Sequence, residues 1–310
     1  MHFLGVDVGG THCRCEWWPP DSRPGAHSRG VQPAVHGVDA AVEALHEVLA
    51  NVAPHDAPTA AVCAMAGVGD PSTARSIVDG LRAHGIDFPV AVVADVLAAA
   101  AAGLVDGPAL MLWSGTGSFA VARDRDGELH RTGGRGHLLG DQGSGFDLVR
   151  RAAAAVLLAV DGLGPPTLLA DALTGAFGAS SPQRLGAVLQ RLDSGQIAAR
   201  LPIVLTTAAA GDAVANEVIT AGIDGLSMLA NAAVRRAGLE WRELPVALGG
   251  GVLAPDGALA ALLAERLASF GAAAPRFLEA RAAARGAAWL AHEVHHRREP
   301  ALTWVQRVTI

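Results

Sequence analysis

Lysine is absent from this chain of 310 residues, so all 24 of its basic side chains are arginines. A phosphate-binding loop of the Walker type needs a lysine that reaches the β- and γ-phosphates of a nucleotide. Schiff-base catalysis likewise depends on a lysine amine. The composition therefore excludes both kinds of chemistry.

Cysteine is scarce, and its three positions, Cys13, Cys15 and Cys63, are too few and too unevenly spaced for a disulfide framework. Cys13 and Cys15 stand two residues apart in a predicted strand, so their side chains face the same side of a sheet. We interpret them as small buried thiols, which pack like other apolar side chains.

Long apolar runs are also missing, and no stretch approaches the roughly 18 consecutive apolar residues of a membrane span. The first residues have neither the basic region nor the apolar core of a signal peptide. The net charge of -6 argues against nucleic acid as a partner. We therefore expect a cytoplasmic protein that binds neither membranes nor nucleic acid.

The chain is 51% hydrophobic and 17% charged, which is enough apolar side chain to form a large core. Its length suits one large domain or two lobes with a cleft between them. Strands and helices alternate in the pattern of an α/β fold. Apolar runs predict strands at residues 3–8, 13–18, 60–65, 90–94, 109–113, 119–123, 128–131 and 245–248. Helical periodicity predicts helices at 38–51 and 71–85. We expect residues 21–32 to form a turn into a third strand.

Two glycine-rich segments, residues 5–11 (GVDVGGT) and 114–118 (SGTGS), each lie between two predicted strands. Their small residues let backbone N–H groups wrap around an anion. The repeated strand, glycine turn and strand indicate an internally duplicated fold. Together the two turns predict a clamp that grips a polyphosphate from both sides.

Two carboxylates occupy positions typical of a phosphoryl-transfer site. Asp7 stands directly before the first glycine turn, where it can hold Mg²⁺ beside phosphates or simply cap the turn. Asp95 ends a buried strand, and the carboxyl ends of strands are where open α/β sheets bind ligands. There it can accept a proton from an attacking hydroxyl, a role compatible with capping the next helix.

A third glycine-dense segment covers residues 133–145, and a fourth covers residues 249–251 after a strand. In the third, Asp141 and Gln142 offer adjacent acceptors and donors for vicinal hydroxyls or an amine. In the fourth, the glycines allow a flat ring such as adenine to approach the backbone closely.

The order of these motifs resembles the superfamily of acetate and sugar kinases, actin and the large heat-shock chaperones. More narrowly, the chain resembles the BadF/BadG/BcrA/BcrD ATPase-like family, which includes N-acetylglucosamine kinase and bacterial glucosamine kinase. The resemblance implies an α/β, duplicated ribonuclease-H-like fold of the actin/hexokinase type, with two lobes and a cleft between them. Residues 1–112 would form the N-terminal lobe, completed by a helix at 290–310, and residues 113–289 would form the C-terminal lobe.

The resemblance also assigns roles to individual residues. Asp95 would be the catalytic base and a substrate ligand, and Asp7 the Mg²⁺ ligand. Further substrate-binding residues would be Arg135, Gly136, Asp141 and Gln142. The residues that would bind ATP are Gly9, Gly10, Thr11, Gly115, Thr116, Gly117, Ser118, Ala208, Gly249, Gly250 and Gly251.

The implied activity is transfer of the γ-phosphoryl group of ATP to O6 of an amino sugar. Arg135 and Gln142 stand where N-acetylglucosamine kinases have Trp and Glu, which favours the glucosamine branch. The alternatives are an N-acetylglucosamine kinase, a non-sugar ATPase and an inactive sugar-binding regulator. The ATPases that share an iron–sulfur cluster are disfavoured because no cysteine follows Cys63. A sugar-sensing regulator should carry a DNA-binding segment, and we expect none ahead of the first strand, which disfavours this alternative.

Two further motifs match known patterns without the expected context. Residues 292–296 (HEVHH) fit the zinc-protease pattern, but we interpret them as an exposed helix end. Residues 115–120 (GTGSFA) fit a dinucleotide fingerprint, which requires a following helix where a strand is predicted. The alanine- and leucine-rich helices between residues 147 and 237 could form the face of a homodimer or an ordinary core.

Overall fold

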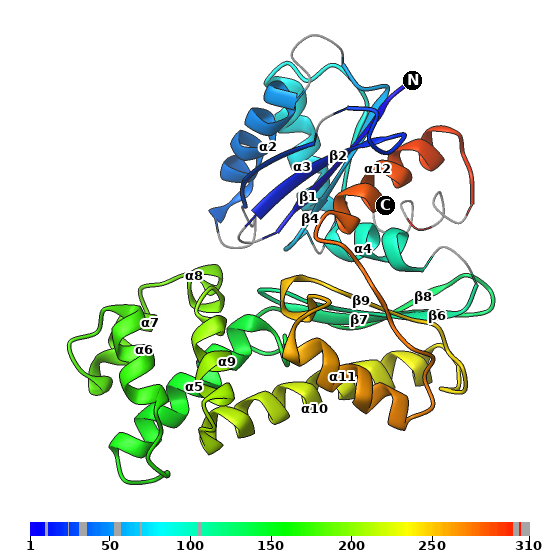
Figure 1. Ribbon diagram of the computed structural model, residues 1–310. Coiled ribbons are helices and arrows are strands. Elements are labelled where there is room, and N and C mark those ends of the chain that lie inside the picture. Colours follow the sequence, from blue (N-terminus) through cyan, green and yellow to red (C-terminus); the bar gives the residue numbers. More distant parts are fainter. Residues whose placement is uncertain are drawn as a thin grey trace. The chain divides into compact units, whose positions relative to one another are not determined.

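The computed structural model describes residues 1–9, 12–23, 25–30, 36–52, 57–68, 70–104, 107–299 and 304 (Figure 1). The chain forms two compact units. Unit 1 comprises Met1–Pro108, Arg123–Leu129 and Leu278–Ile310, and unit 2 comprises Ala109–Ala122 and His130–Phe277. These limits differ from the expected lobe boundaries at residues 112 and 290, and the division into domains stays a prediction.

Unit 1 is built on a five-stranded sheet of order β3-β2-β1-β4-β5. Its strands are β1 (Phe3–Val8), β2 (His12–Trp18), β3 (Ala26–Arg29), β4 (Ala60–Met65) and β5 (Val90–Ala94). β1 and β2 form the predicted hairpin, whereas β1, β4 and β5 run parallel. The third strand expected after a turn is β3, which begins inside the segment 21–32 and so starts earlier than expected. The segment has room for a short strand that pairs with β2.

The side chains of β1 alternate between the two faces of the sheet, and each face packs on different helices. Val6 points to the face that packs on α2 (Val38–Val52) and α3 (Pro71–Ala83). All three cysteines are free, buried and part of this same apolar cluster, as predicted for Cys13 and Cys15. The opposite face, which carries Gly5, packs on α12 (Ala282–His295). α12 also packs on α4 (Asp95–Gly103).

The start of α3 shows why the sequence forms a helix at this point. Asp70 has an extended backbone, and its carboxylate accepts hydrogen bonds from the N–H groups of Ser72 (2.9 Å) and Thr73 (3.0 Å). Pro71 occupies the first turn, where its missing N–H costs nothing. The hydrogen bonds hold the pKa of Asp70 below its ordinary value. α3 therefore begins at the predicted residue.

Unit 2 has a second five-stranded sheet, of order β10-β9-β6-β7-β8. Its strands are β6 (Ala109–Ser114), β7 (Ser118–Arg123), β8 (Leu129–Gly133), β9 (Val246–Gly249) and β10 (Arg276–Phe277). A strand therefore follows residues 115–117, which confirms that they do not form a dinucleotide fingerprint. Both units begin with a strand, a glycine turn and a second strand, the repeat predicted from the sequence.

Helices pack against the second sheet and against one another to form the larger core of the chain. They are α5 (Gly145–Val160), α6 (Leu169–Phe177), α7 (Leu185–Leu189), α8 (Ser194–Ala198), α9 (Leu201–Ala209), α10 (Ala213–Arg236) and α11 (Ala258–Ser269). The long helix α10 packs on α5, α9, α11 and β6. Among the described residues, no helix has the length and apolar character needed to cross a membrane.

Candidate functional site

The two carboxylates singled out in unit 1 lie at one edge of its sheet. Asp7 is in register with Ala64 of β4, which is itself in register with Val93 of β5. Asp95 follows Val93 by two residues and begins α4. Since parallel strands end at a common edge, the topology brings both carboxylates together.

The pKa of Asp7 is raised from 3.8 to about 7. Burial among protein atoms is the largest cause, although part of the side chain stays accessible, and the negative charge of Asp95 is the second. The positive charge of Arg14, opposite Asp7 in the hairpin register, lowers the pKa and offsets part of both. A cation beside Asp7 would relieve the same electrostatic penalty.

This raised pKa predicts a pH-dependent loss of stability. The folded protein holds a proton on Asp7 that the unfolded chain releases above pH 4, so stability falls as pH rises from about 4 to about 7. The shift corresponds to at most about 4 kcal/mol, and we expect about 2 kcal/mol because Asp7 is partly accessible. Asp7→Asn should therefore gain stability relative to wild type as pH rises from about 4 to about 7, measured by urea denaturation. Parallel pH profiles of the two proteins would contradict this expectation.

The first glycine turn is described only in part. The N–H of Gly9 donates to the carbonyl of His12 (2.9 Å), which closes the connection between β1 and β2. Gly10 and Thr11 lie outside the described residues, so their predicted contact with phosphate stays a prediction.

The second glycine turn connects β6 to β7 and is fixed from two sides. The N–H of Gly115 donates to the carbonyl of Gly117 (2.8 Å), and the N–H of Gly145 donates to the carbonyl of Gly115 (2.8 Å). Gly250 has φ of 92°, and a Cβ atom there would lie 2.2 Å from the carbonyl oxygen of Ser114. The structure therefore places the glycine run after β9 directly against the start of this turn.

The third glycine segment is hydrogen-bonded to the same turn. Ser114 Oγ donates to the carbonyl of Gly143 (3.0 Å), and Ser118 Oγ donates to the carbonyl of Gln142 (2.7 Å). The N–H of Ser118 donates to Asp141 Oδ1 (3.3 Å). The two segments thus form one connected cluster within unit 2.

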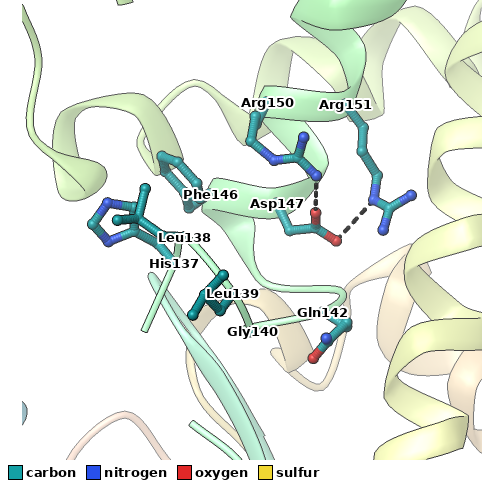
Figure 2. A pocket seen from close by; sticks show the side chains of 9 residues that line it. All are labelled: His137, Leu138, Leu139, Gly140, Gln142, Phe146, Asp147, Arg150 and Arg151. Carbon is teal, nitrogen blue, oxygen red and sulfur yellow. Dashed lines mark hydrogen bonds and ion pairs between the residues drawn. The ribbon is translucent and has the colours of Figure 1, made fainter. Parts of the chain in front are cut away.

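Asp141 and Gln142, predicted to act together on one ligand, have different surroundings. Asp141 is buried with φ of 59°, and its Oδ2 would lie 3.0 Å from a Cβ atom at Gly117. Its carboxylate therefore contacts the second glycine turn. Gln142 instead lines a pocket at the N-terminus of α5 (Figure 2). Their substrate-binding roles stay predictions.

The pocket has a volume of about 280 Å³ and contains residues that the sequence interpretation missed. Asp147 accepts hydrogen bonds from Arg150 Nη2 (2.8 Å), Arg151 Nε (2.9 Å) and the N–H of Gly143 (3.0 Å). Burial opposes ionisation of Asp147, but these donors hold its pKa below the ordinary value. The signal was the spacing of an acid and two bases at i, i+3 and i+4, which places them together on a helix.

Other predicted site residues lie in varied environments. Arg135 is exposed, and Gly136 has φ of 87°. Ala208 is buried in α9, where its carbonyl accepts a hydrogen bond from Asn216 Nδ2 (3.1 Å). Gly249 is the last residue of β9, and Gly251 begins a short 3₁₀ turn. None of these placements assigns a ligand to the residue.

The residues of the zinc-protease pattern in α12 make other contacts in the structure. Glu293 is buried and bonds to His292 Nδ1 (2.7 Å) and Arg298 Nη1 (3.2 Å). The ring of His292 packs edge-on against Phe3. Within the described part of the chain, no group of three or more metal-ligating side chains is found. The interpretation as an exposed helix end is wrong for Glu293, which is buried, and for His292, whose ring packs on Phe3.

A model of the BadF/BadG/BcrA/BcrD ATPase family matches residues 4–291 of this chain. The chain belongs to this family. The predicted resemblance is thereby confirmed, on a match that spans both units.

Similar proteins extend the comparison. The chain is 28% identical over 196 residues to the N-acetylmuramic acid/N-acetylglucosamine kinase of Clostridium acetobutylicum, covering 62% of this chain and 64% of that one. It is 26% identical to the N-acetyl-D-glucosamine kinase of Dictyostelium discoideum, covering 86% and 89%. It is 28% identical to the glucosamine kinase GspK of Vibrio cholerae, covering 57% and 61%. The first and third alignments therefore span less than two thirds of those relatives.

The fold has a counterpart in the structure of a candidate N-acetylglucosamine kinase from Chromobacterium violaceum. The two share a TM-score of 0.72 at 23% identity, over 93% of this chain and 98% of that chain. At this identity the likeness shows the fold alone. The predicted α/β fold of the actin/hexokinase type is thereby confirmed.

Proposed function

We propose that this protein is an ATP-dependent amino-sugar kinase that transfers the γ-phosphoryl group of ATP to O6 of glucosamine. The observation that carries the proposal is the carboxylate pair Asp7 and Asp95 at one edge of the first sheet, close enough to shift the pKa of Asp7. Family membership and the names of the relatives support kinase chemistry on amino sugars.

In the proposed mechanism, Asp95 is the catalytic base. Its Oδ1 accepts a hydrogen bond from the N–H of Val96 (2.9 Å), which orients the carboxylate at the start of α4. Asp95 then binds the sugar hydroxyl, aims its oxygen at the γ-phosphorus and accepts its proton. The transfer needs no covalent phospho-enzyme, because positioning and charge neutralisation supply most of the catalysis in phosphoryl transfer.

The donor set at Asp7 fits a magnesium ion. Mg²⁺ commonly takes only one or two protein carboxylates together with phosphate oxygens and water, and the electrostatic penalty on Asp7 is one that a cation relieves. A bound Mg²⁺ would neutralise charge on the phosphates of ATP. We assign the phosphates to the two glycine turns, with Thr116 and Gly117 at the tip of the second.

N-acetylglucosamine is the second candidate substrate, and the names of two of the three relatives favour it. Glucosamine is favoured by Arg135 and Gln142, which stand where the N-acetylglucosamine kinases carry Trp and Glu. Both sugars present the same O6 hydroxyl, so the difference lies only at the 2-position.

A substrate panel tests the proposal. We expect ATP-dependent ADP release with glucosamine at a kcat/KM at least about tenfold above that with N-acetylglucosamine, glucose or N-acetylmannosamine. The reason is that polar side chains that pair with an amine are left without partners by an acetamide. A preference for N-acetylglucosamine would support the second candidate instead. ADP release that no sugar stimulates would indicate a non-sugar ATPase, and sugar binding without ADP release would indicate a regulator.

A further inference from the structure

The pocket lined by Gln142 also contains Asp147, Arg150 and Arg151, three charged residues to which the proposed reaction gives no role. One wall is the segment from His137 to Gly140, and the other is the first turns of α5 (Figure 2). Its volume of about 280 Å³ lies near the lower end of the range for small-molecule sites, which matches a ligand of monosaccharide size.

The charges in this pocket do not balance. Asp147 is its only acidic lining residue, whereas Arg150 and Arg151 both line it. Each arginine uses one nitrogen on Asp147, through Nη2 of Arg150 and Nε of Arg151. Their side chains stay 49% and 38% exposed, while the Asp147 side chain is only 6% exposed. One positive charge is therefore left over, and two further nitrogens on each guanidinium are directed to other groups or to solvent.

Two other features of the pocket indicate the chemistry of the uncharged part of the ligand. The amide oxygen Oε1 of Gln142 is buried and accepts no hydrogen bond from the described residues. It therefore offers an acceptor that a ligand hydroxyl would satisfy. Leu138 and Leu139 at the rim are 85% and 90% exposed, so a ligand ring that covered them would remove apolar surface from water.

We propose that this pocket binds a hydroxylated ring that carries a carboxylate or a phosphate group, that is, a sugar acid or a sugar phosphate. Arg150 and Arg151 hold the anionic group in charge-assisted hydrogen bonds. Gln142 accepts from a ring hydroxyl, and Leu139 covers the ring. The proposal shares Gln142 with the proposed amino-sugar site, but it concerns binding alone and is tested without turnover.

Calorimetric titration of the nucleotide-free protein tests it, with glucose 6-phosphate, glucuronate and neutral glucose as probes. We expect saturable binding of at least one anion, at least about tenfold tighter than that of glucose. Arg150→Gln combined with Arg151→Gln should weaken the anion by at least about tenfold. Arg235→Gln combined with Arg236→Gln, an exposed adjacent pair in the last turn of α10, is the matched control and should change nothing.

A second variant keeps the test valid if the double substitution disturbs folding. Asp147→Asn removes the competing negative charge and retains both guanidinium groups, so the anion should bind more tightly. A merely structural ion-pair cluster predicts no such gain, and unchanged or weaker binding would overturn the proposal. Equal affinity in the double variant and its control, equal binding of glucose and the anions, or no saturable binding would overturn it as well. Whichever of glucose 6-phosphate and glucuronate binds more tightly shows whether the pocket prefers a phosphate or a carboxylate group.

Discussion

Asp95→Asn is expected to lower the turnover of ATP and amino sugar by about a thousandfold, the scale on which general-base catalysis operates. Asparagine keeps the oxygen that accepts the hydrogen bond from Val96, so the start of α4 should be preserved. It removes the group that takes the proton from the sugar hydroxyl. The loss should therefore appear in kcat, with the KM for ATP and the melting temperature close to those of wild type.

The matched control for this prediction is Asp87→Asn. Asp87 is an exposed aspartate of unit 1 that precedes β5, and the same change of charge should leave kcat within about twofold of wild type. Coupled ADP-release kinetics measure both variants. If Asp95→Asn retained wild-type turnover, Asp95 could not be the base. If its melting temperature fell with its activity, the residue would be structural.

The sequence predicts most of this fold because the relevant signals are local. The apolar runs that form β1, β4, β5 and β6 are short and bounded by glycine or proline, which defines them without tertiary information. The carboxyl-end positions of Asp7 and Asp95 follow from the same runs, because parallel strands share an edge. Sequence order alone therefore indicates that these two side chains meet.

Other features depend on contacts that sequence order does not reveal. The third strand begins at Ala26, inside the segment 21–32, because it pairs there with the edge of β2, and the turn-forming residues of this segment do not show where the strand starts. The pocket at α5 was missed because its lining combines the loop from His137 to Gly140 with a helix face. The raised pKa of Asp7 depends on how deeply the strand end is buried. Each of these is set by packing, which overrides local propensity.

The packing of α12 is a feature of this kind, and it carries the largest expected effect on stability. A Cβ atom at Gly286 would lie 2.1 Å from the carbonyl oxygen of Ala98 in α4, and one at Gly5 would lie 2.1 Å from the carbonyl oxygen of Ala284. Both obstacles are backbone atoms, which cannot rotate away. Gly286→Ala should therefore lower the free energy of unfolding by about 3 kcal/mol or more, as overpacking of a tight interface does.

Gly175→Ala provides the matched control, since the same substitution in a helix should have the opposite sign. Gly175 lies inside α6, and a Cβ atom there would meet nothing within 4 Å. Alanine should stabilise this helix by about 0.5–1 kcal/mol because it restricts the unfolded backbone. Urea denaturation followed by tryptophan fluorescence measures both variants. Equal effects of the two substitutions would mean that α12 and α4 lie further apart than the structure has them, and that the close approach permitted by Gly286 does not hold unit 1 together.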